Sequence, residues 1–378
     1  MTVLVHGCRS NLAERDALAA LAGPGRTVIN SCAVTASAVR DARAAARAAT
    51  GDIIITGCAA TYAPERFADL AVTLIPNSLK LQPFAWNRSG PPPAAVTRQS
   101  RGFVAVQDGC DHCCTFCVTT LARGASRSIP VARIIDSVMT LVASGTNEVV
   151  LTGIDTTSYG LDLPNTPTLG ALVQSLLASI PDLPRLRISS LDAAEADDAL
   201  LEAFADPRLM PHIHLSLQSG DDLVLKRMKR RHSRADAVRL VARLKSARPD
   251  IAIGADLIAG FPTEGEAAHR NSLALLADCD IVHAHIFPYS ARPGTPAARM
   301  PQVPAPIRKQ RAADLRSAAQ LRKKAFLESH LDVPVQTVSE GAQGYTPRYA
   351  AIRYGNPQPK GALVTVTPHS IADGLLHA

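Results

Sequence analysis

The stretch FVAVQDGCDHCCTFC, residues 103–117, determines how the rest of the chain is interpreted. It ends with four cysteines in eight residues: Cys110, Cys113, Cys114 and Cys117. All four could bind zinc as adjoining C-x2-C pairs, but structural zinc sites usually take their two pairs from separate parts of a chain. A second frame is a C-x3-C-x2-C set without Cys113, and a third uses Cys110, Cys113 and Cys117. Ordinary electron-transfer [4Fe–4S] clusters take four thiolates, whereas three thiolates leave one iron open to chelate a substrate.

The composition is that of a basic globular protein. The chain has 378 residues, 47% hydrophobic and 19% charged, which suits two or three domains with buried cores. Its net charge of +7 and pI near 9.1 favour a polyanionic partner. No apolar run reaches the ~18–20 residues of a membrane span, and the N-terminus lacks the basic residues of a secretory signal. We expect a cytoplasmic protein without membrane contact, whose eight cysteines serve metal binding or catalysis rather than disulfides.

Residues 102–330 alternate strand-like and helix-like runs six times. The strand-like runs are 103–107, 148–153, 185–190, 212–218, 251–260 and 281–289, and the helix-like runs between them include 234–247. Eight such units close a TIM barrel, so six predict an open (β/α)6 partial barrel with a lateral gap for a large substrate. Functional residues of such barrels lie at the carboxyl ends of the strands. Because the cysteine loop follows the first strand, we expect it over the barrel mouth.

Residues 1–78 predict a separate parallel α/β domain. Strand-like runs at 2–6, 27–31, 52–56 and 71–75 alternate with alanine-rich helical runs. Cys8, Cys32 and Cys58 each follow one of the first three strands within two residues. The carboxyl ends of parallel strands share one edge, where ligands bind, so the three thiols should meet there. They could instead be three small buried residues, but their common register favours a metal site.

Three further segments complete the predicted organisation. Residues 79–101 contain a run of three prolines and little periodicity, and are predicted to be a linker. A basic helical run covers 306–329, and its cationic face need not be paired locally. Residues 331–378 contain short strand-like runs broken by Gly and Pro, which predict a small β-barrel or sandwich.

The C-x3-C-x2-C frame of Cys110, Cys114 and Cys117, with Phe116 before the third cysteine, resembles the signature of the radical S-adenosylmethionine enzymes. GCDHCCTFCVTTLARGASRS, 109–128, is similar to the central motif of the methylthiotransferase family within that superfamily. VHGCRSN, INSCAVT and ITGCAAT resemble the three cysteine-bearing segments of that family's N-terminal domain. The resemblance covers essentially the whole chain and is poorest in the linker.

The resemblance implies a transferase that uses S-adenosylmethionine and two [4Fe–4S] clusters. One cluster would sit on Cys110, Cys114 and Cys117, and the other on Cys8, Cys32 and Cys58. The first would reduce S-adenosylmethionine to a deoxyadenosyl radical, which would abstract hydrogen from C2 of an adenine. The second would deliver sulfur, to be methylated by another cofactor molecule. The C-terminal β domain would correspond to the RNA-binding, TRAM-like domain of the family.

The family divides by substrate. GIDTTSYG, 153–160, and HLSLQSG, 214–220, resemble the branch that acts on N6-threonylcarbamoyladenosine next to the tRNA anticodon. We therefore predict that the partners are a tRNA anticodon stem-loop and an electron donor. The alternatives are isopentenyladenosine in tRNA, an aspartate of a ribosomal protein, or, from another class, a non-catalytic zinc-dependent RNA-binding protein.

Several polar residues fall at predicted strand ends facing the barrel mouth, and a structural hydrogen bond is the alternative role for each. The predicted cofactor-binding residues are Gly153, Asp155, Ser190, Gln218 and Asp256, with Asp192 and Ser219 at the same strand ends. Gly153 would permit close backbone approach or simply end its strand.

Basic residues near the cysteine loop are predicted to bind substrate or RNA: Arg123, Arg127, Lys229, Arg230 and Arg231. The last three belong to LKRMKRRHSR, 225–234, which suits a phosphate backbone. The alternatives are a solvated helix end and surface ion pairs. His283 and His285 share one strand face and, like Cys279, are predicted to be structural.

Overall fold

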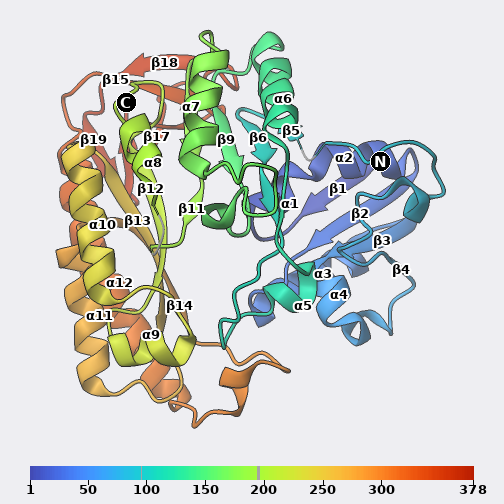
Figure 1. Ribbon diagram of the computed structural model, residues 1–378, viewed down its shortest axis with the longest axis horizontal. Coiled ribbons are helices and arrows are strands. Elements are labelled where there is room, and N and C mark those ends of the chain that lie inside the picture. The colour runs from blue at the N-terminus through green and yellow to red at the C-terminus, as the bar shows by residue number, and fades with distance from the viewer. Residues whose placement is uncertain (95, 194–195) are drawn as a thin grey trace.

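In the computed structural model, an N-terminal unit lies beside an open barrel, and a β-sheet covers the end of the barrel opposite the cysteine loop (Figure 1). The structure describes residues 1–94, 96–193 and 196–378. Mixed α/β structure with parallel sheets confirms the predicted fold class. Within the described residues, no helix is both long and apolar enough to cross a membrane.

The N-terminal unit is a parallel sheet in the order β1–β2–β3–β4. Its strands are β1 (Thr2–Val5), β2 (Arg26–Ser31), β3 (Asp52–Gly57) and β4 (Thr73–Leu74), and its helices are α1 (Arg9–Ala13), α2 (Arg15–Ala22), α3 (Ala36–Ala48) and α4 (Cys58–Tyr62). Alternate residues of β2 face opposite sides: Val28 packs on the leucines of α2, and Ile29 packs on the alanine face of α3. Helices on both faces bury the strands and leave the carboxyl edge open for the cysteines.

The barrel wall consists of two sheets, β10–β9–β6–β5 and β11–β12–β13–β14. The strands are β5 (Val96–Arg98), β6 (Gly102–Ala105), β9 (Val149–Thr152), β10 (Leu186–Ile188), β11 (Ser190–Leu191), β12 (His212–Gln218), β13 (Ala252–Ala259) and β14 (Ile281–Pro288). The predicted third strand, 185–190, is divided, because β10 pairs with β9 whereas β11 pairs with β12. The two sheets therefore meet at Ser189.

Helices cover the outer face of the barrel (Figure 1). They are α6 (Val131–Ala143), α7 (Leu169–Ser179), α8 (Asp198–Ala203), α9 (Asp222–Met228), α10 (Arg234–Ala247), α11 (Glu266–Asp278) and α12 (Ala305–Glu328). α10 begins at a capping box, in which the side chains of Ser233 and Asp236 bond each other's backbone N–H groups. Its bounds agree with the helical run expected from the sequence. The largest hydrophobic core lies between these helices and the strands.

Helix α1 of the N-terminal unit docks on the inner face of the first barrel sheet. Phe103 and Val150 of β6 and β9 pack against Leu12 and Ala13 of α1. The next residue of β6, Val104, points the other way into the outer core. Cys8 is the N-cap of α1, so this contact fixes one N-terminal cysteine relative to the barrel.

The segment predicted to be a linker contains regular structure. A 3-10 turn, Pro83–Trp86, buries Trp86 against the N-terminal sheet. Further along the segment, β5 pairs antiparallel with β6 at the edge of the barrel. Little periodicity marked these residues because a three-residue edge strand and a single turn are too short to show one.

The C-terminal sheet has the order β18–β15–β16–β17–β20–β19. Its strands are β15 (Val335–Ser339), β16 (Gln343–Tyr345), β17 (Ala351–Arg353), β18 (Leu363–Val366), β19 (Ser370–Ala372) and β20 (Leu375–His377). The three strand-like runs seen in the sequence contain β15, β17 and β18. The other three strands have three residues each, again too few for a pattern.

A loop of the C-terminal unit closes the amino end of the barrel. The Tyr349 ring stacks on His212, with centroids 4.7 Å apart, and Arg187 Nη1 donates to Pro347 O at 3.1 Å. Arg187 also pairs with the buried Glu148, at 3.0 Å between Nε and Oε1. Tyr349 Oη accepts a 2.7 Å hydrogen bond from Arg9, the residue after Cys8. All three units therefore contact one another around the barrel.

Candidate active site between two sets of cysteines

The cysteine loop starts from a tight turn at the end of the first barrel strand. Gly109 has φ +75°, and a Cβ there would lie 1.9 Å from Ala125 O, so only glycine fits. Cys110, Cys114 and Cys117 then line one cavity of about 150 Å³, which we call the Cys114 cavity. Cys113 is exposed on the other side of the loop. This arrangement favours the frame that leaves Cys113 out.

The loop thiols have different electrostatic surroundings. Burial raises the pKa of Cys110 to about 12, and the neighbouring Asp155 carboxylate adds to the rise. Burial also disfavours the Cys114 thiolate, but a hydrogen bond from His112 and the charge of Arg230 outweigh it and lower the pKa of Cys114. Arg230 Nη1 lies 3.5 Å from Cys114 Sγ. Cationic donors of this kind stabilise a thiolate ready to bind a metal.

Three predicted cofactor-binding residues line the Cys114 cavity: Asp155, Ser190 and Gln218. Gln218 has φ +65° where the register between β12 and β13 shifts, a strained conformation for a non-glycine residue. Gly153 does not line the cavity. A Cβ there would lie 3.2 Å from Gln107 O, so this glycine allows close packing behind the cavity.

His112 was not predicted as a site residue. Its Nε2 lies 3.0 Å from Asp155 Oδ2 and its Nδ1 lies 3.7 Å from Asp192 Oδ2. It thus joins the cysteine loop to the ends of the second and third barrel strands. The available signal in the sequence was its position inside the cysteine motif, two residues after Cys110.

The three N-terminal cysteines converge as their strand positions predict. Gly7 has φ +90°, and a Cβ there would lie 2.7 Å from Cys32 Sγ. Burial, with the nearby Cys8 and Cys58 thiols, raises the pKa of Cys32 to about 11. Ionisation of one thiol is disfavoured by ionisation of its neighbours, and a bound cation or cluster would stabilise the thiolate forms.

Arg123, from helix α5 (Thr119–Arg123) after the cysteine loop, lies among the N-terminal thiols. Its Nε is 3.3 Å from Cys58 Sγ and its Nη2 is 3.9 Å from Cys8 Sγ. Nη1 donates to Asp108 Oδ1 at 2.6 Å, and Glu14 lies 3.5 Å away. Burial alone would lower the pKa of Arg123, but these thiols and carboxylates raise it. The guanidinium therefore stays cationic.

The Arg123 side chain is 1% exposed and the Arg230 side chain 6% exposed, both beside cysteines, and Arg230 also lines the Cys114 cavity. Both were predicted from their sequence positions as substrate or RNA contacts. The sequence could not distinguish a guanidinium at a thiol from one in solvent, because the difference depends on how the loops pack.

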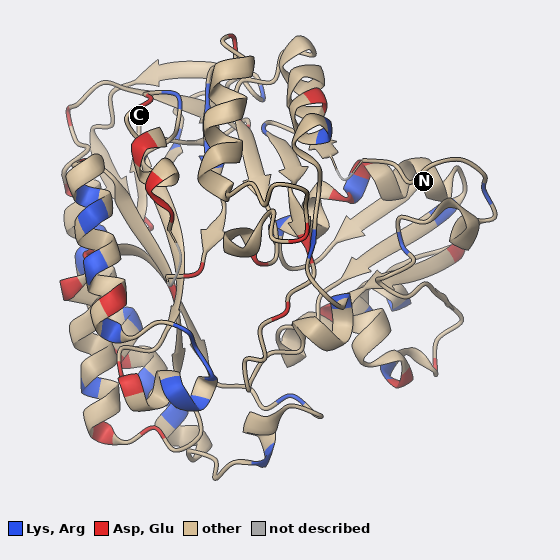
Figure 2. Ribbon diagram, viewed as in Figure 1, with Lys and Arg blue, Asp and Glu red and all other residues tan. Residues whose placement is uncertain are grey.

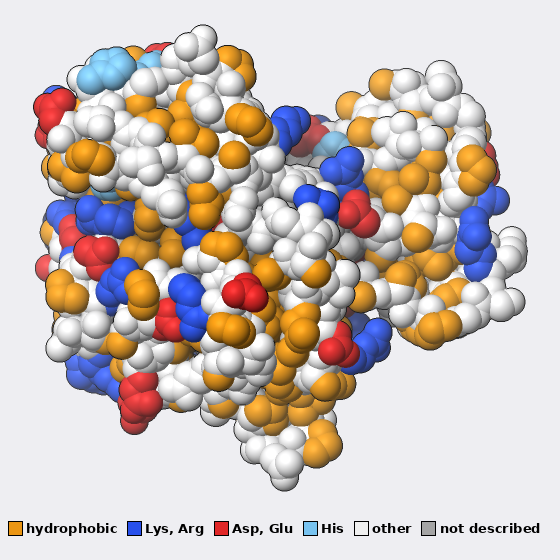
Figure 3. Space-filling view, turned by 90° about the horizontal axis from the view of Figure 1, so that it is seen from above, with side chains coloured by type: hydrophobic (Ala, Val, Ile, Leu, Met, Phe, Trp, Pro, Cys, Tyr) orange, Lys and Arg blue, Asp and Glu red, His pale blue; other side chains and the backbone are white. Residues whose placement is uncertain are grey.

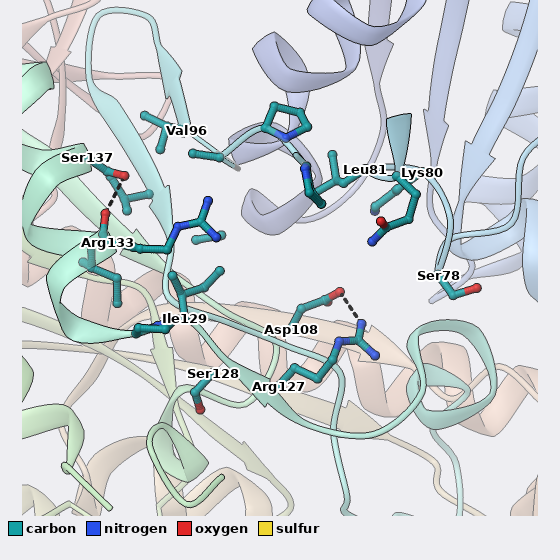
Figure 4. Close-up of a pocket in the computed structure, with 18 of the residues that line it drawn as sticks. Ser78, Lys80, Leu81, Val96, Asp108, Arg127, Ser128, Ile129, Arg133 and Ser137 are labelled. Atoms are coloured by element: carbon teal, nitrogen blue, oxygen red, sulfur yellow. Dashed lines mark hydrogen bonds and ion pairs between the residues drawn. The ribbon is translucent and has the colours of Figure 1, made fainter. Parts of the chain in front are cut away.

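The remaining predicted basic contacts are exposed around the cysteine loop. Lys229 and Arg231 line a cavity of about 400 Å³ beside Cys113. Arg127 pairs with Asp108 at 3.3 Å and lines a cavity of about 510 Å³ that α6 and the segment before β5 enclose (Figure 4). Arg133 of α6 also lines that cavity (Figure 4). In the space-filling view a notch separates the N-terminal unit from the rest, with basic side chains at its rim (Figure 3).

Basic residues also gather on the helices α9 to α12 (Figure 2). The expectation that the cationic face of the 306–329 helix need not be paired locally holds for Arg311 and Arg322, whereas Lys324 lies 3.8 Å from Glu328 in the same helix. Arg311 is buried against Glu264, with Nη1 3.0 Å from Oε1, and Arg322 pairs with Asp280. These partners come from distant segments, so the local sequence could not reveal them.

A second cavity, of about 220 Å³, adjoins the first and is called the Cys117 chamber. It shares Phe116, Cys117 and Gln218 with the Cys114 cavity, and its far wall includes Val34, two residues after Cys32. Asp256, predicted to bind cofactor, lines this chamber rather than the first cavity. The chamber therefore lies between the two sets of cysteines.

The Asp256 carboxylate is held by two histidines. Its Oδ1 lies 3.0 Å from His214 Nε2 and 3.2 Å from His285 Nδ1. His285 is thus a chamber-side partner, whereas His283 on the same strand face packs against Phe326 and Tyr349 at the barrel's amino end. Cys279 is fully buried in the outer core, in keeping with a structural role.

The fold and the three-cysteine loop define a radical SAM enzyme. The model of the radical SAM superfamily matches residues 104–276. A solved structure with the same fold is the radical S-adenosylmethionine methyltransferase TsrM from Kitasatospora setae, with a TM-score of 0.55 at 15% identity. That match covers 76% of this chain and 66% of TsrM.

Two curated relatives identify the family. The chain is 41% identical over 366 residues to threonylcarbamoyladenosine tRNA methylthiotransferase MtaB of Rickettsia prowazekii, covering 89% of this chain and 87% of that protein. It is 34% identical over 321 residues to the Thermotoga maritima protein of the same name, covering 77% and 73%. The chain belongs to the MtaB family of radical SAM methylthiotransferases, and it is a transferase.

Membership of the radical SAM superfamily implies a [4Fe–4S] cluster and S-adenosylmethionine. The residues present fit both groups. Cys110, Cys114 and Cys117 are free thiols that line one cavity, so they would hold three irons of the cluster and leave the fourth without a protein ligand, available to the cofactor. Asp155, whose Oδ2 lies 3.8 Å from Cys110 Sγ, and the amide of Gln218 line the same cavity and supply polar partners for the cofactor.

Proposed function

We propose that this enzyme adds a methylthio group to C2 of N6-threonylcarbamoyladenosine in the anticodon stem-loop of tRNA. The observation that carries the proposal is the Cys117 chamber, which opens between two sets of three cysteines and is large enough for a nucleobase substituent. The names of both curated relatives support the threonylcarbamoyl substrate.

A second [4Fe–4S] cluster on Cys8, Cys32 and Cys58 is part of this proposal. The convergence of the three thiols and the position of Arg123 among them support it. When bound, the clusters and S-adenosylmethionine supply the radical and sulfur chemistry. The protein's own residues position the two sites on either side of the substrate and exclude water from the space between them.

Each of the three units has its own role in this proposal. Residues 1–78 hold the second cluster, 79–101 connect the units, 102–330 hold the first cluster and the cofactor, and 331–378 bind RNA in the manner of a TRAM domain. Arg127, Lys229 and Arg231, exposed around the cysteine loop, contact tRNA phosphates. Tyr349 and Arg9 connect the RNA-binding unit to the cysteine sites. The enzyme works in the cytoplasm with an electron donor still to be identified.

The test is reconstitution followed by turnover. Anaerobic reconstitution should give about eight irons with matching sulfide per chain, the content of two [4Fe–4S] clusters. Incubation with S-adenosylmethionine, a reductant and a threonylcarbamoylated stem-loop should then add a methylthio group, measured by mass spectrometry. Formation of product on an isopentenyladenosine stem-loop but not on the threonylcarbamoylated one would show that N6-threonylcarbamoyladenosine is not the substrate. Stoichiometric zinc without iron would reject the catalytic proposal.

A further inference from the structure

The Cys117 chamber contains a buried arginine that the sequence did not single out. Arg292 lies in the loop after β14 and is only 6% exposed. Its guanidinium lies over the ring of Tyr62 from α4, 5.5 Å from the centroid. The Arg292 carbonyl accepts hydrogen bonds from the backbone N–H and the hydroxyl of Thr295, so the loop is held in place.

Across residues 1–94, 96–193 and 196–378, no acidic group lies within ion-pairing distance of the Arg292 guanidinium, and the Nε of Arg292 is buried without a hydrogen-bond partner. The other charged residue lining the chamber is Asp256, whose carboxylate is already held by His214 and His285. A buried cation without a counter-charge is unfavourable, and a bound anion removes that penalty.

The other side chains that line the Cys117 chamber indicate the kind of molecule that carries this anion. Phe116 and Ile258 form an apolar wall, and Phe287, 40% exposed, lies at the same chamber. Aromatic faces of this kind stack on unpaired bases. The ligand therefore combines a flat, apolar part with an anionic group that a guanidinium can bind in a bidentate manner, as it binds carboxylates.

We propose that Arg292 binds the carboxylate of the threonyl group of the substrate and makes the enzyme prefer it to adenosines with uncharged N6 substituents. This inference rests on the proposed function, because the threonylcarbamoyl group supplies the carboxylate. The chamber sets the base between Cys117 on one side and the Cys32 loop on the other, and Arg292 fixes the far end of the substituent.

The methionine carboxylate of S-adenosylmethionine is a second possible source of the anion. The two sources are distinguished by where the defect appears when Arg292 is replaced. Loss of the substrate contact changes discrimination between RNAs, whereas loss of a cofactor contact weakens S-adenosylmethionine binding whatever RNA is present.

The experiment uses the reconstituted full-length enzyme with two anticodon stem-loops. One carries N6-threonylcarbamoyladenosine, and the other carries its carboxamide, which keeps the shape and removes the charge. Both kcat/KM for methylthio product and affinity by fluorescence anisotropy are measured for the wild type, Arg292→Gln and Arg292→Lys. Arg299→Gln is the matched control, because Arg299 is exposed further along the same segment.

We expect the wild type to prefer the carboxylate by about 10- to 100-fold, the effect of one desolvated charge-assisted contact. Arg292→Gln should remove this preference, Arg292→Lys should keep part of it, and Arg299→Gln should leave it unchanged. Affinity for S-adenosylmethionine should not change in any variant.

Three results would overturn the assignment. One is a wild-type carboxylate preference that survives Arg292→Gln. Another is an equal loss on both stem-loops, as a purely structural contact with Tyr62 predicts. The third is weakened S-adenosylmethionine binding, which would assign the anion to the cofactor. If no stem-loop is methylthiolated, the proposed function fails by itself. The anisotropy ratios then still decide whether Arg292 recognises the carboxylate.

Discussion

At the scale of single residues, both sets of cysteines use the same arrangement. A buried guanidinium lies between a thiol and a carboxylate: Arg123 between Cys58 and Asp108, and Arg230 between Cys114 and Asp192. The carboxylates orient the arginines and keep them charged, and Arg123 Nε and Arg230 Nη1 are directed at sulfur. Hydrogen bonds to cluster sulfurs and local charge are the main protein controls over cluster potential.

Replacing Arg123 by Met should therefore lower the reduction potential of the cluster proposed on Cys8, Cys32 and Cys58. The expected change is about 60–130 mV, the one-electron equivalent of ~1.5–3 kcal/mol for a hydrogen bond to a charged group. Arg123→Lys should restore part of it. The potential is measured by potentiometric EPR in a background with Cys110, Cys114 and Cys117 changed to Ala, so that one cluster remains. Arg127→Met is the control, since Arg127 shares Asp108 but is solvent-exposed. Equal potentials for Arg123→Met and wild type would refute this role.

Cys113 and Cys114 are adjacent in sequence and lie on opposite sides of their loop. Cys114→Ser should cost one cluster, and therefore about four irons per chain, together with deoxyadenosine formation. Cys113→Ser should retain both, because the exposed thiol is not directed at the cavity. Iron and sulfide analysis after anaerobic reconstitution checks both variants. Loss of iron on changing Cys113 would restore the frame built on Cys110, Cys113 and Cys117.

At the scale of elements, glycines fix the cysteines to the ends of their strands. Gly7, Gly57 and Gly109 directly precede Cys8, Cys58 and Cys110, and all three have positive φ. A Cβ at Gly57 would lie 2.4 Å from Ser31 O, so the strand can turn into α4 only without a side chain. The turn at each glycine therefore places the following cysteine directly against a neighbouring segment of the chain.

Gly7→Ala should consequently disrupt the N-terminal site while leaving the barrel site intact. The added methyl would collide with Cys32, whose Cβ and Sγ lie 2.4 and 2.7 Å from the Cβ position. We expect loss of about four irons with deoxyadenosine formation retained. Gly25→Ala is the matched control, because Gly25 also has positive φ but nothing within 4 Å of its Cβ position. Iron loss of the same size in Gly25→Ala would mean that backbone strain, rather than crowding of Cys32, is responsible.

The elements also show what the sequence could and could not predict. Long periodic segments such as 234–247 were predicted with correct bounds, because one helix face carries its own signal. The division of 185–190 between two sheets was missed, since strand propensity does not say which neighbour a strand pairs with. For the site, the short motifs at the strand ends predicted that Cys8, Cys32 and Cys58 would meet. Arg123, Arg292 and His112 owe their places to contacts between distant segments.

At the scale of the whole molecule, the two ends of the barrel have opposite chemistry. The carboxyl end gathers thiols and carboxylates for catalysis. The amino end is closed by the stacked rings of His212 and Tyr349, with His283 edge-on to both. Tyr349 belongs to the C-terminal unit, and its hydroxyl contacts Arg9 beside Cys8. A change in packing at the amino end of the barrel should therefore affect both the unit proposed to bind RNA and the N-terminal cysteines.

This amino end makes the fold sensitive to acid. Burial lowers the pKa of His283 to about 3 and holds that of His212 well below its usual range, and nearby cations such as Arg187 add to both effects. In the unfolded chain both imidazoles titrate near 6.5. Between about pH 6.5 and 3 the unfolded chain therefore binds protons that the folded protein does not. Stability must then fall as the pH falls, by about 1.4 kcal/mol per pH unit for each histidine.

We expect the unfolding temperature of the reconstituted enzyme to fall steadily from pH 6 to pH 5, above the range where carboxylates titrate. His283→Gln should make that fall shallower, by the equivalent of about one proton taken up on unfolding, because glutamine does not titrate. Glutamine can still donate a hydrogen bond to Arg348 O, as His283 Nε2 does at 3.1 Å. His369→Gln is the control, since that histidine is exposed in the C-terminal sheet segment. Calorimetry at fixed scan rate gives the slopes. A slope unchanged by His283→Gln would mean that the closed end of the barrel admits protons, and that Tyr349 does not seal it.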